Sequence, residues 1–173
     1  MNSEKSKTMD EFILDLGSND GMVRQRARYS LVCKGEPAVD SLVKAFNETK
    51  ANEYSHFEAA KALSQIGSVK ANETFLNALN DDDFGVRWVA AEGLVAIGEK
   101  AIKPLLRTLG CNVELMTIRE GAHHVLHDLF HRKRLDEKTS KAVKNVLDAY
   151  HSVSSESESY LPQAVNNALL DLS

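Results

Sequence analysis

The strongest constraint on the fold is a short motif that recurs along the chain at nearly constant spacing. Four pairs of an alanine followed four residues later by a leucine are separated by steps of 32, 31 and 32 residues. The four pairs are Ala27 with Leu31, Ala59 with Leu63, Ala90 with Leu94, and Ala122 with Leu126. Three copies then place a glycine at one offset, as Gly35, Gly67 and Gly98. A period of this length is typical of helical repeats that stack to share a core.

Each copy reads as a helical hairpin, and the clearest one runs from Asp81 to Gly110. Its two halves each carry apolar residues at helical spacing on either side of Gly98, and Asp81 or Asp82 is available as an N-cap. The first stripe is Val86, Ala90, Leu94 and Ile97, and the second is Ile102, Leu105, Leu106 and Leu109. The sequence therefore predicts four hairpins, at residues 20–46, 52–79, 81–109 and 112–151, within a solenoid that spans residues 1–153.

The two ends differ from the middle because a terminal unit has one face without a neighbour. Thr8 and Glu11 have the spacing of a capping box, which predicts a cap helix over residues 8–16. A polar stretch at residues 154–159 is expected to be a flexible linker. Apolar residues at helical spacing then predict a final amphipathic helix over residues 160–173.

Composition favours an ordinary packed protein and argues against several classes of partner. The chain has 173 residues, 43% of them hydrophobic, with a formal net charge of −4, which disfavours broad attraction to nucleic acid or anionic membranes. The two cysteines, Cys33 and Cys111, cannot build a disulfide framework or a four-cysteine zinc site. No segment has the length and apolarity of a membrane span or the pattern of a signal peptide, so a cytoplasmic location and no membrane partner are expected.

The run Asp83-x-x-Val86-Arg87, followed by Ala90-Ala91, Leu94 and Ile97-Gly98, resembles the HEAT repeat, in particular its short variant in phycobilisome lyase-type proteins. The resemblance covers roughly residues 20–150. It implies an all-α fold, a right-handed alpha-alpha superhelix or alpha-solenoid of about four HEAT-like hairpins with capping helices. In such a superhelix the second helices line the concave side and usually bind protein.

The resemblance also implies roles for the charged residues of the signature, which in this family commonly bond between neighbouring units. A structural role between repeats is therefore expected for Asp20, Arg24, Asp83, Arg87 and Arg119. The set is incomplete, because the second unit has His56 where an arginine is expected.

A non-catalytic protein-binding module or adaptor is the function that the pattern favours, with another protein or a peptide as its partner. Residues of the second helices that lie away from the apolar stripes are the candidates for the concave surface. They are Asp40, Lys44, Glu73, Asn77, Lys103, Arg107, Lys144 and Asp148. Phe57 and Trp88 occupy equivalent positions one unit apart, where they serve either as an exposed aromatic anchor pair or as packing between units.

Catalysis is not predicted, and no cofactor is expected. The chain lacks a glycine-rich phosphate loop, a nucleophile elbow and a His-Glu-x-x-His motif. An accessory subunit of a lyase-like or metal-dependent enzyme is the first alternative. His123, His127 and His131 recur at helical spacing and could place two imidazoles on one metal. The nearest precedent is the HEAT-type di-iron hydroxylase, which resembles this chain in its repeats. That enzyme binds metal through His-Glu pairs, and no His-Glu dipeptide occurs here.

Two further alternatives concern the C-terminal third. The segment 132–144 gathers six basic residues against Asp136 and Glu137, so it could touch nucleic acid phosphates, although no aromatic residue interleaves it. The more ordinary interpretation is a solvated turn. The final helix could instead pack into the groove of its own molecule or of a second copy, which would give self-association.

Overall fold

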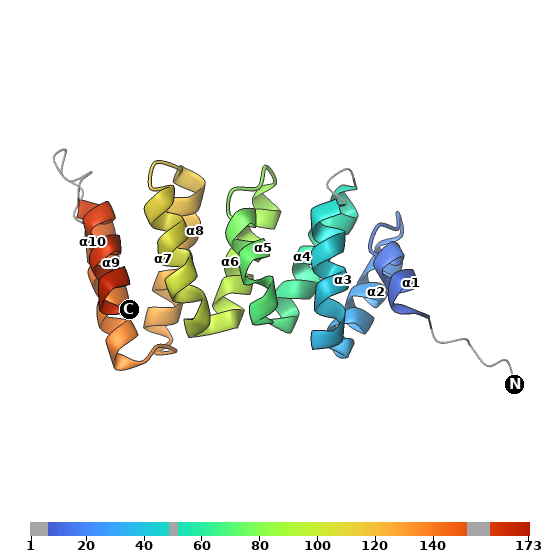
Figure 1. The fold of residues 1–173 in the computed structure, drawn as a ribbon. Coiled ribbons are helices and arrows are strands. Elements are labelled where there is room, and N and C mark those ends of the chain that lie inside the picture. The colour runs from blue at the N-terminus through green and yellow to red at the C-terminus, as the bar shows by residue number, and fades with distance from the viewer. Residues whose placement is uncertain (1–6, 49–51, 152–159) are drawn as a thin grey trace, which may run out of the picture. The chain divides into compact units, whose positions relative to one another are not determined.

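The fold is all-α over the residues that the computed structural model describes, which are 7–48, 52–151 and 160–173. The chain divides into two compact units, Met1–Ala71 and Asn72–Ser173. No strand is found in these described ranges, and helical hairpins build both units (Figure 1). The prediction of an all-α fold of HEAT-like hairpins is confirmed.

The first unit contains four α-helices and one turn of 3-10 helix within its described part. These are α1 (Met9–Asp15), α2 (Gly21–Lys34), α3 (Glu36–Glu48), α4 (Glu53–Ile66) and the 3-10 turn η1 (Val69–Ala71). The second unit contains α5 (Asn72–Ala78), α6 (Phe84–Ile97), the 3-10 turn η2 (Gly98–Ala101), α7 (Ile102–Cys111), α8 (Met116–His131), α9 (Glu137–His151) and α10 (Tyr160–Asp171). The segment expected to be a flexible linker lies outside the described residues.

Helices α1, α2, α4 and α6 begin at residues whose side chains accept hydrogen bonds from free backbone N–H groups. At α1 the capping box is confirmed, because the Thr8 hydroxyl accepts from Glu11 N and Thr8 N donates to the Glu11 carboxylate at 2.6 Å. These bonds from Thr8 lower the pKa of Glu11. At α2 and α6 an aspartate alone is the cap, since Met22 N donates to the Asp20 carboxylate at 2.8 Å and Gly85 N to the Asp83 carboxylate at 2.6 Å. The expectation of Asp81 or Asp82 as the cap of α6 is therefore wrong, because the helix begins one residue after Asp83.

The first helices end at backbone conformations that suit glycine. Gly35 and Gly98 have φ of 65° and 80° with ψ of −135° and −145°, a region that residues with a β-carbon avoid. The fourth repeat has no glycine there, and its first helix, α8, has 16 residues where α2, α4 and α6 have 14 each.

Lys133 ends α8 in place of a glycine. It is the one non-glycine residue with positive φ in the described part of the chain, at 53°. Lys133 N donates to Phe130 O at 3.1 Å, and Arg134 N donates to Leu129 O at 3.1 Å, which is the bond pattern of a Schellman motif. The turn at residues 132–134 therefore depends on a left-handed lysine.

The core of the first unit lies between α2, α3 and α4. Leu31, Leu42 and Leu63 are fully buried there. The imidazole of His56 stacks on the ring of Phe46 at a centroid distance of 4.1 Å, and its Nδ1 lies 2.9 Å from Phe46 O. An ion pair between Arg28 and Glu58, both nearly buried, joins α2 to α4.

The core of the second unit depends on glycines that lie beneath large side chains. Phe75 on α5 is fully buried, and a β-carbon built at Gly93 on α6 would lie 2.4 Å from its ring. Leu79 fills the space at Gly121 on α8, where a β-carbon would lie 2.7 Å from Leu79 Cδ2. The helices approach closely because these positions lack a side chain.

A substitution at Gly93 tests this packing. We expect Gly93→Ala to lower the free energy of unfolding by about 1–2 kcal/mol, because the clash with Phe75 outweighs the roughly 1 kcal/mol gain in helix propensity. Urea unfolding followed by circular dichroism measures the change. The control is Gly21→Ala at the first residue of α2, where the nearest atom to the new β-carbon is Arg24 Nη2 at 3.5 Å, an ordinary contact distance. Equal stabilisation by both substitutions would contradict the packing described here.

The turn at Lys133 gives a second prediction. Left-handed backbone costs a non-glycine residue about 1–2 kcal/mol, and glycine loses about 0.5–1 kcal/mol more backbone entropy on folding. Lys133→Gly should therefore raise the free energy of unfolding by about 0.5–1 kcal/mol in the same assay. Lys133→Ala removes the same charge and keeps the strain, so it should not stabilise the protein. A gain with alanine as large as that with glycine would point to charge and not to backbone.

Candidate protein-binding surface

The candidate residues of the first unit lie on the exposed side of α3. Asp40 and Lys44 are both exposed, one helical turn apart. The Asp40 carboxylate lies 3.5 Å from Lys70 Nζ, which also lies 3.7 Å from the carboxylate of Glu36. These contacts are between highly exposed groups, so they contribute little to stability and leave the face polar.

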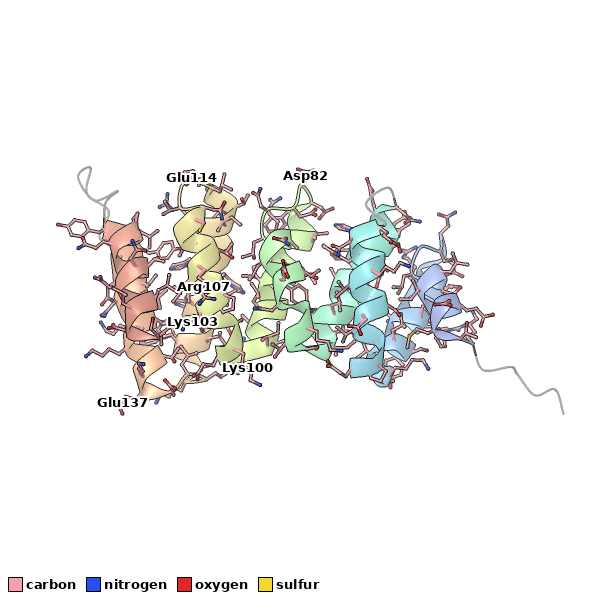
Figure 2. The ribbon with its side chains drawn as sticks, viewed as in Figure 1. Asp82, Lys100, Lys103, Arg107, Glu114 and Glu137 are labelled. Atoms are coloured by element: carbon pink, nitrogen blue, oxygen red, sulfur yellow. The ribbon has the colours of Figure 1, made fainter. Side chains whose placement is uncertain are left out.

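In the second unit, candidates from two neighbouring helices share one layer. Glu73 and Asn77 are exposed on α5, and Lys103 and Arg107 lie one turn apart on α7. Figure 2 shows Lys103 and Arg107 on the side of α7 that faces the viewer. In the same view, Figure 1 shows α5 and α7 on the viewer's side of the second unit. The apolar residues of α7 are buried, among them Leu105, Leu106 and Leu109. The structure thus places Glu73, Asn77, Lys103 and Arg107 on two neighbouring helices of one unit.

The final helix α10 packs against α7 and α9 of its own unit. Leu161, Val165 and Ala168 are buried in this contact. Gly110 on α7 allows the approach, because a β-carbon there would lie 3.3 Å from Val165 Cγ1. Lys103 Nζ donates to Leu172 O at 3.0 Å and so supplies a cation at the carboxyl end of α10.

The other two candidates of the second unit lie on α9. Lys144 Nζ donates to the Asp148 carboxylate at 2.6 Å, and both side chains are exposed. Helix α9 packs mainly against α8 and α10, and it is α10 that lies beside α7. Lys144 and Asp148 therefore lie on a helix whose main neighbours do not include α7, the helix of Lys103 and Arg107.

The two aromatic candidates lie in different units. Phe57 on α4 is half-buried, with Lys61 Nζ 5.2 Å from its ring centroid. Trp88 on α6 is 50% exposed, and its ring lies 4.8 Å from the ring of His124. Trp88 is therefore the more accessible of the two.

The signature arginines of the first and third repeats hold the segments that precede α2 and α6. Arg24 Nη1 donates to Ser18 O at 2.6 Å, and Arg87 Nη1 donates to Asp81 O at 2.7 Å, six residues back in both cases. Arg24 also lies over the ring of Tyr54 at 4.1 Å, which links α2 to α4. In the fourth repeat, the backbone carbonyl of the exposed Arg119 accepts a hydrogen bond from Tyr150 OH at 3.0 Å.

The three candidate metal ligands lie one helical turn apart along α8, and each ring is close to the next. The ring centroids lie 5.8 Å apart for His123 and His127, and 4.2 Å apart for His127 and His131. His123 also packs edge-on against Tyr150, whose pKa burial raises. Within the described part of the chain, no group of three or more His, Cys, Asp or Glu side chains is arranged to hold a metal ion.

The basic segment 132–144 uses part of its charge within the molecule. Arg132 Nε pairs with the Asp128 carboxylate at 3.0 Å, and Arg134 Nη1 donates to Val95 O at 3.0 Å. Asp136 accepts from Thr139 N at 2.7 Å at the start of α9, and this bond lowers the pKa of Asp136. These bonds hold the turn between α8 and α9 in place.

Several polar contacts in the structure have no counterpart in the sequence pattern. Glu99 accepts from Asp136 N at 2.8 Å and from the Thr139 hydroxyl at 3.3 Å, so it joins η2 to the start of α9. His124 Nε2 donates to the Glu92 carboxylate at 2.8 Å, across α6 and α8. The partners of these bonds lie between 32 and 40 residues apart in the sequence, and a helical periodicity gives no signal for such pairs.

Comparison with known proteins agrees with the hairpin geometry. A family model described as HEAT repeats matches residues 39–115. This match supports a relationship to the HEAT-repeat family over the central part of the chain, and it does not distinguish the short lyase-type variant. No curated protein matches the chain. Among the described residues, no helix has the combined length and apolarity needed to cross a bilayer.

The docking of α10 can be tested at Val165, which is fully buried. We expect Val165→Asp to detach α10 from α7 and α9, because burying an unpaired carboxylate costs several kcal/mol. Hydrogen exchange measured by mass spectrometry should show lost protection in residues 160–171, with α5 and α6 unchanged. The control is Asn166→Asp, which places the same charge at an exposed position. Retained protection of α10 in the Val165 variant would argue against the docked position.

Proposed function

We propose that this chain is a non-catalytic protein-binding module that uses the exposed face of its second helices. The observation that carries the proposal is the division of α7 into a fully buried apolar face and a polar face with the exposed Arg107 and the half-buried Lys103. Glu73 and Asn77 on α5 extend that face within the same unit. The match to HEAT repeats supports the proposal, since such arrays commonly mediate protein–protein interaction.

The chemistry of the face indicates the kind of partner. Glu73 is negative, whereas Lys103 and Arg107 are positive, so a partner surface of mixed charge fits better than a strongly charged polymer. Asp40 and Lys44 give α3 of the first unit the same mixed character. An adaptor that recognises a polar peptide or a folded protein is consistent with this charge pattern.

Site-specific photo-crosslinking tests the proposal directly. A photoreactive phenylalanine analogue at Asn77 or Arg107 should give discrete crosslinked species in native lysate, because a partner on this face lies within reach of both positions. The same analogue at Ala96, an exposed position on α6, is the matched control. Arg107→Glu should then lower the yield of the Asn77 crosslink severalfold, since a reversed charge opposes docking. Equal crosslinking at Ala96, or no effect of Arg107→Glu, would contradict a partner site on the second helices.

A further inference from the structure

A pocket of about 210 Å³ lies between α6 and α8, on the layer of first helices. Ala91 and Gly121 line the pocket, and because they carry little or no side chain they leave space between the two helices. Leu79 reaches under Gly121, close enough to contact a β-carbon built there, and so gives the floor an apolar surface. The pocket therefore offers apolar contact at the bottom of an open depression.

Two exposed aromatic residues form one wall of this pocket. Phe84 and Trp88 are 69% and 50% exposed, and they lie four residues apart on the same face of α6. The ring of His124 stands beside Trp88 and is fixed by its bond to Glu92. An accessible tryptophan face at the edge of a pocket is a common anchor for binding, and such a face attracts cations.

The charge at the rim completes the site. The Glu120 carboxylate lines the pocket, is exposed, and makes no hydrogen bond or ion pair with any described residue. Arg87, the arginine of the lining, donates to Asp81 O and Asp82 O at 2.7 and 3.0 Å in the loop that precedes α6, and its guanidinium also lies 5.6 Å from the ring centroid of Phe84. That loop carries Asp81, Asp82 and Asp83, whose carboxylates offset the charge of Arg87. The acidic side chains at the mouth and in the adjoining loop thus outnumber the one arginine of the lining.

We propose that this pocket binds an arginine or lysine side chain of a partner peptide. The aliphatic stem of such a side chain covers the apolar floor of Leu79 and Ala91, and its cationic group lies over Trp88 within reach of Glu120. Arginine fits better than lysine because the planar guanidinium stacks on aromatic rings and pairs with carboxylates through two bonds. The site lies on α6 and α8, so it stands apart from the second-helix face and does not rest on the proposed function.

The test uses the fluorescence of Trp88, the single tryptophan of the chain. The probe is N-acetyl-leucyl-arginyl-leucinamide, and its matched control replaces arginine with citrulline, which keeps the shape and removes the charge. We expect a saturable change in Trp88 emission with the arginine peptide and an affinity for the citrulline peptide about threefold to tenfold lower. Equal affinity for the two peptides, or no saturable change, overturns the proposal.

A charge variant assigns the effect to one carboxylate. Glu120→Gln should weaken arginine-peptide binding about threefold and leave citrulline-peptide binding unchanged. The control is Glu114→Gln, which changes an exposed acid that does not line the pocket. Glu114 lies in the loop between α7 and α8 (Figure 2). An equal loss in the Glu114 variant indicates a diffuse field and overturns the assignment.

Two further measurements test the proposal without relying on Trp88 emission. Trp88→Leu should abolish binding of a fluorescein-labelled arginine peptide measured by anisotropy, with the helical circular dichroism spectrum retained. Sedimentation velocity without peptide tests the alternative occupant, a second copy of the chain. A concentration-dependent dimer that shields Trp88 would overturn the proposal of a basic peptide.

Discussion

The close approach of neighbouring helices at small side chains is the constraint on which both units depend. The alanines of the repeat, Ala27, Ala59, Ala90 and Ala122, are all buried to at least 99%. Each leucine four residues later is fully buried on the same helix face. A small residue sets the distance between helices, and a large residue next to it fills the space that remains. The recurring pair is therefore a packing motif, which explains why it is maintained through every repeat.

The same constraint decides how much of the fold could be read from the sequence. Helices and hairpin turns were predictable because helical periodicity and capping residues are local signals. Gly93 and Gly121 were not, because each is required by a large side chain from another helix, Phe75 or Leu79. The turn at Lys133 also escaped prediction, since a lysine carries no signal for left-handed backbone. Local chemistry predicted the elements, and contacts between distant residues determined their details.

The candidate site shows a similar division. Exposure of Asp40, Glu73 and Arg107 follows from their position opposite an apolar stripe, so periodicity alone could place them. The position of α10 beside α7 depends on Gly110 meeting Val165, a pairing between segments separated by the whole of α8 and α9. Glu120 became a candidate only when the pocket between α6 and α8 placed it beside Trp88. Site residues defined by a cavity need the cavity to be known.

The position of α10 also separates two residues that the sequence makes equivalent. Lys103 and Arg107 lie one turn apart on α7, yet Lys103 already donates to the carbonyl of Leu172. Arg107 makes no side-chain hydrogen bond or ion pair with any described residue, and it is the more exposed of the two. A partner that binds Lys103 must replace or share the bond to α10, whereas a partner that binds Arg107 meets a guanidinium with all its donors available. Arg107 is therefore the residue of this face from which a carboxylate of a partner gains most, and Lys103 contributes mainly to holding α10 in place.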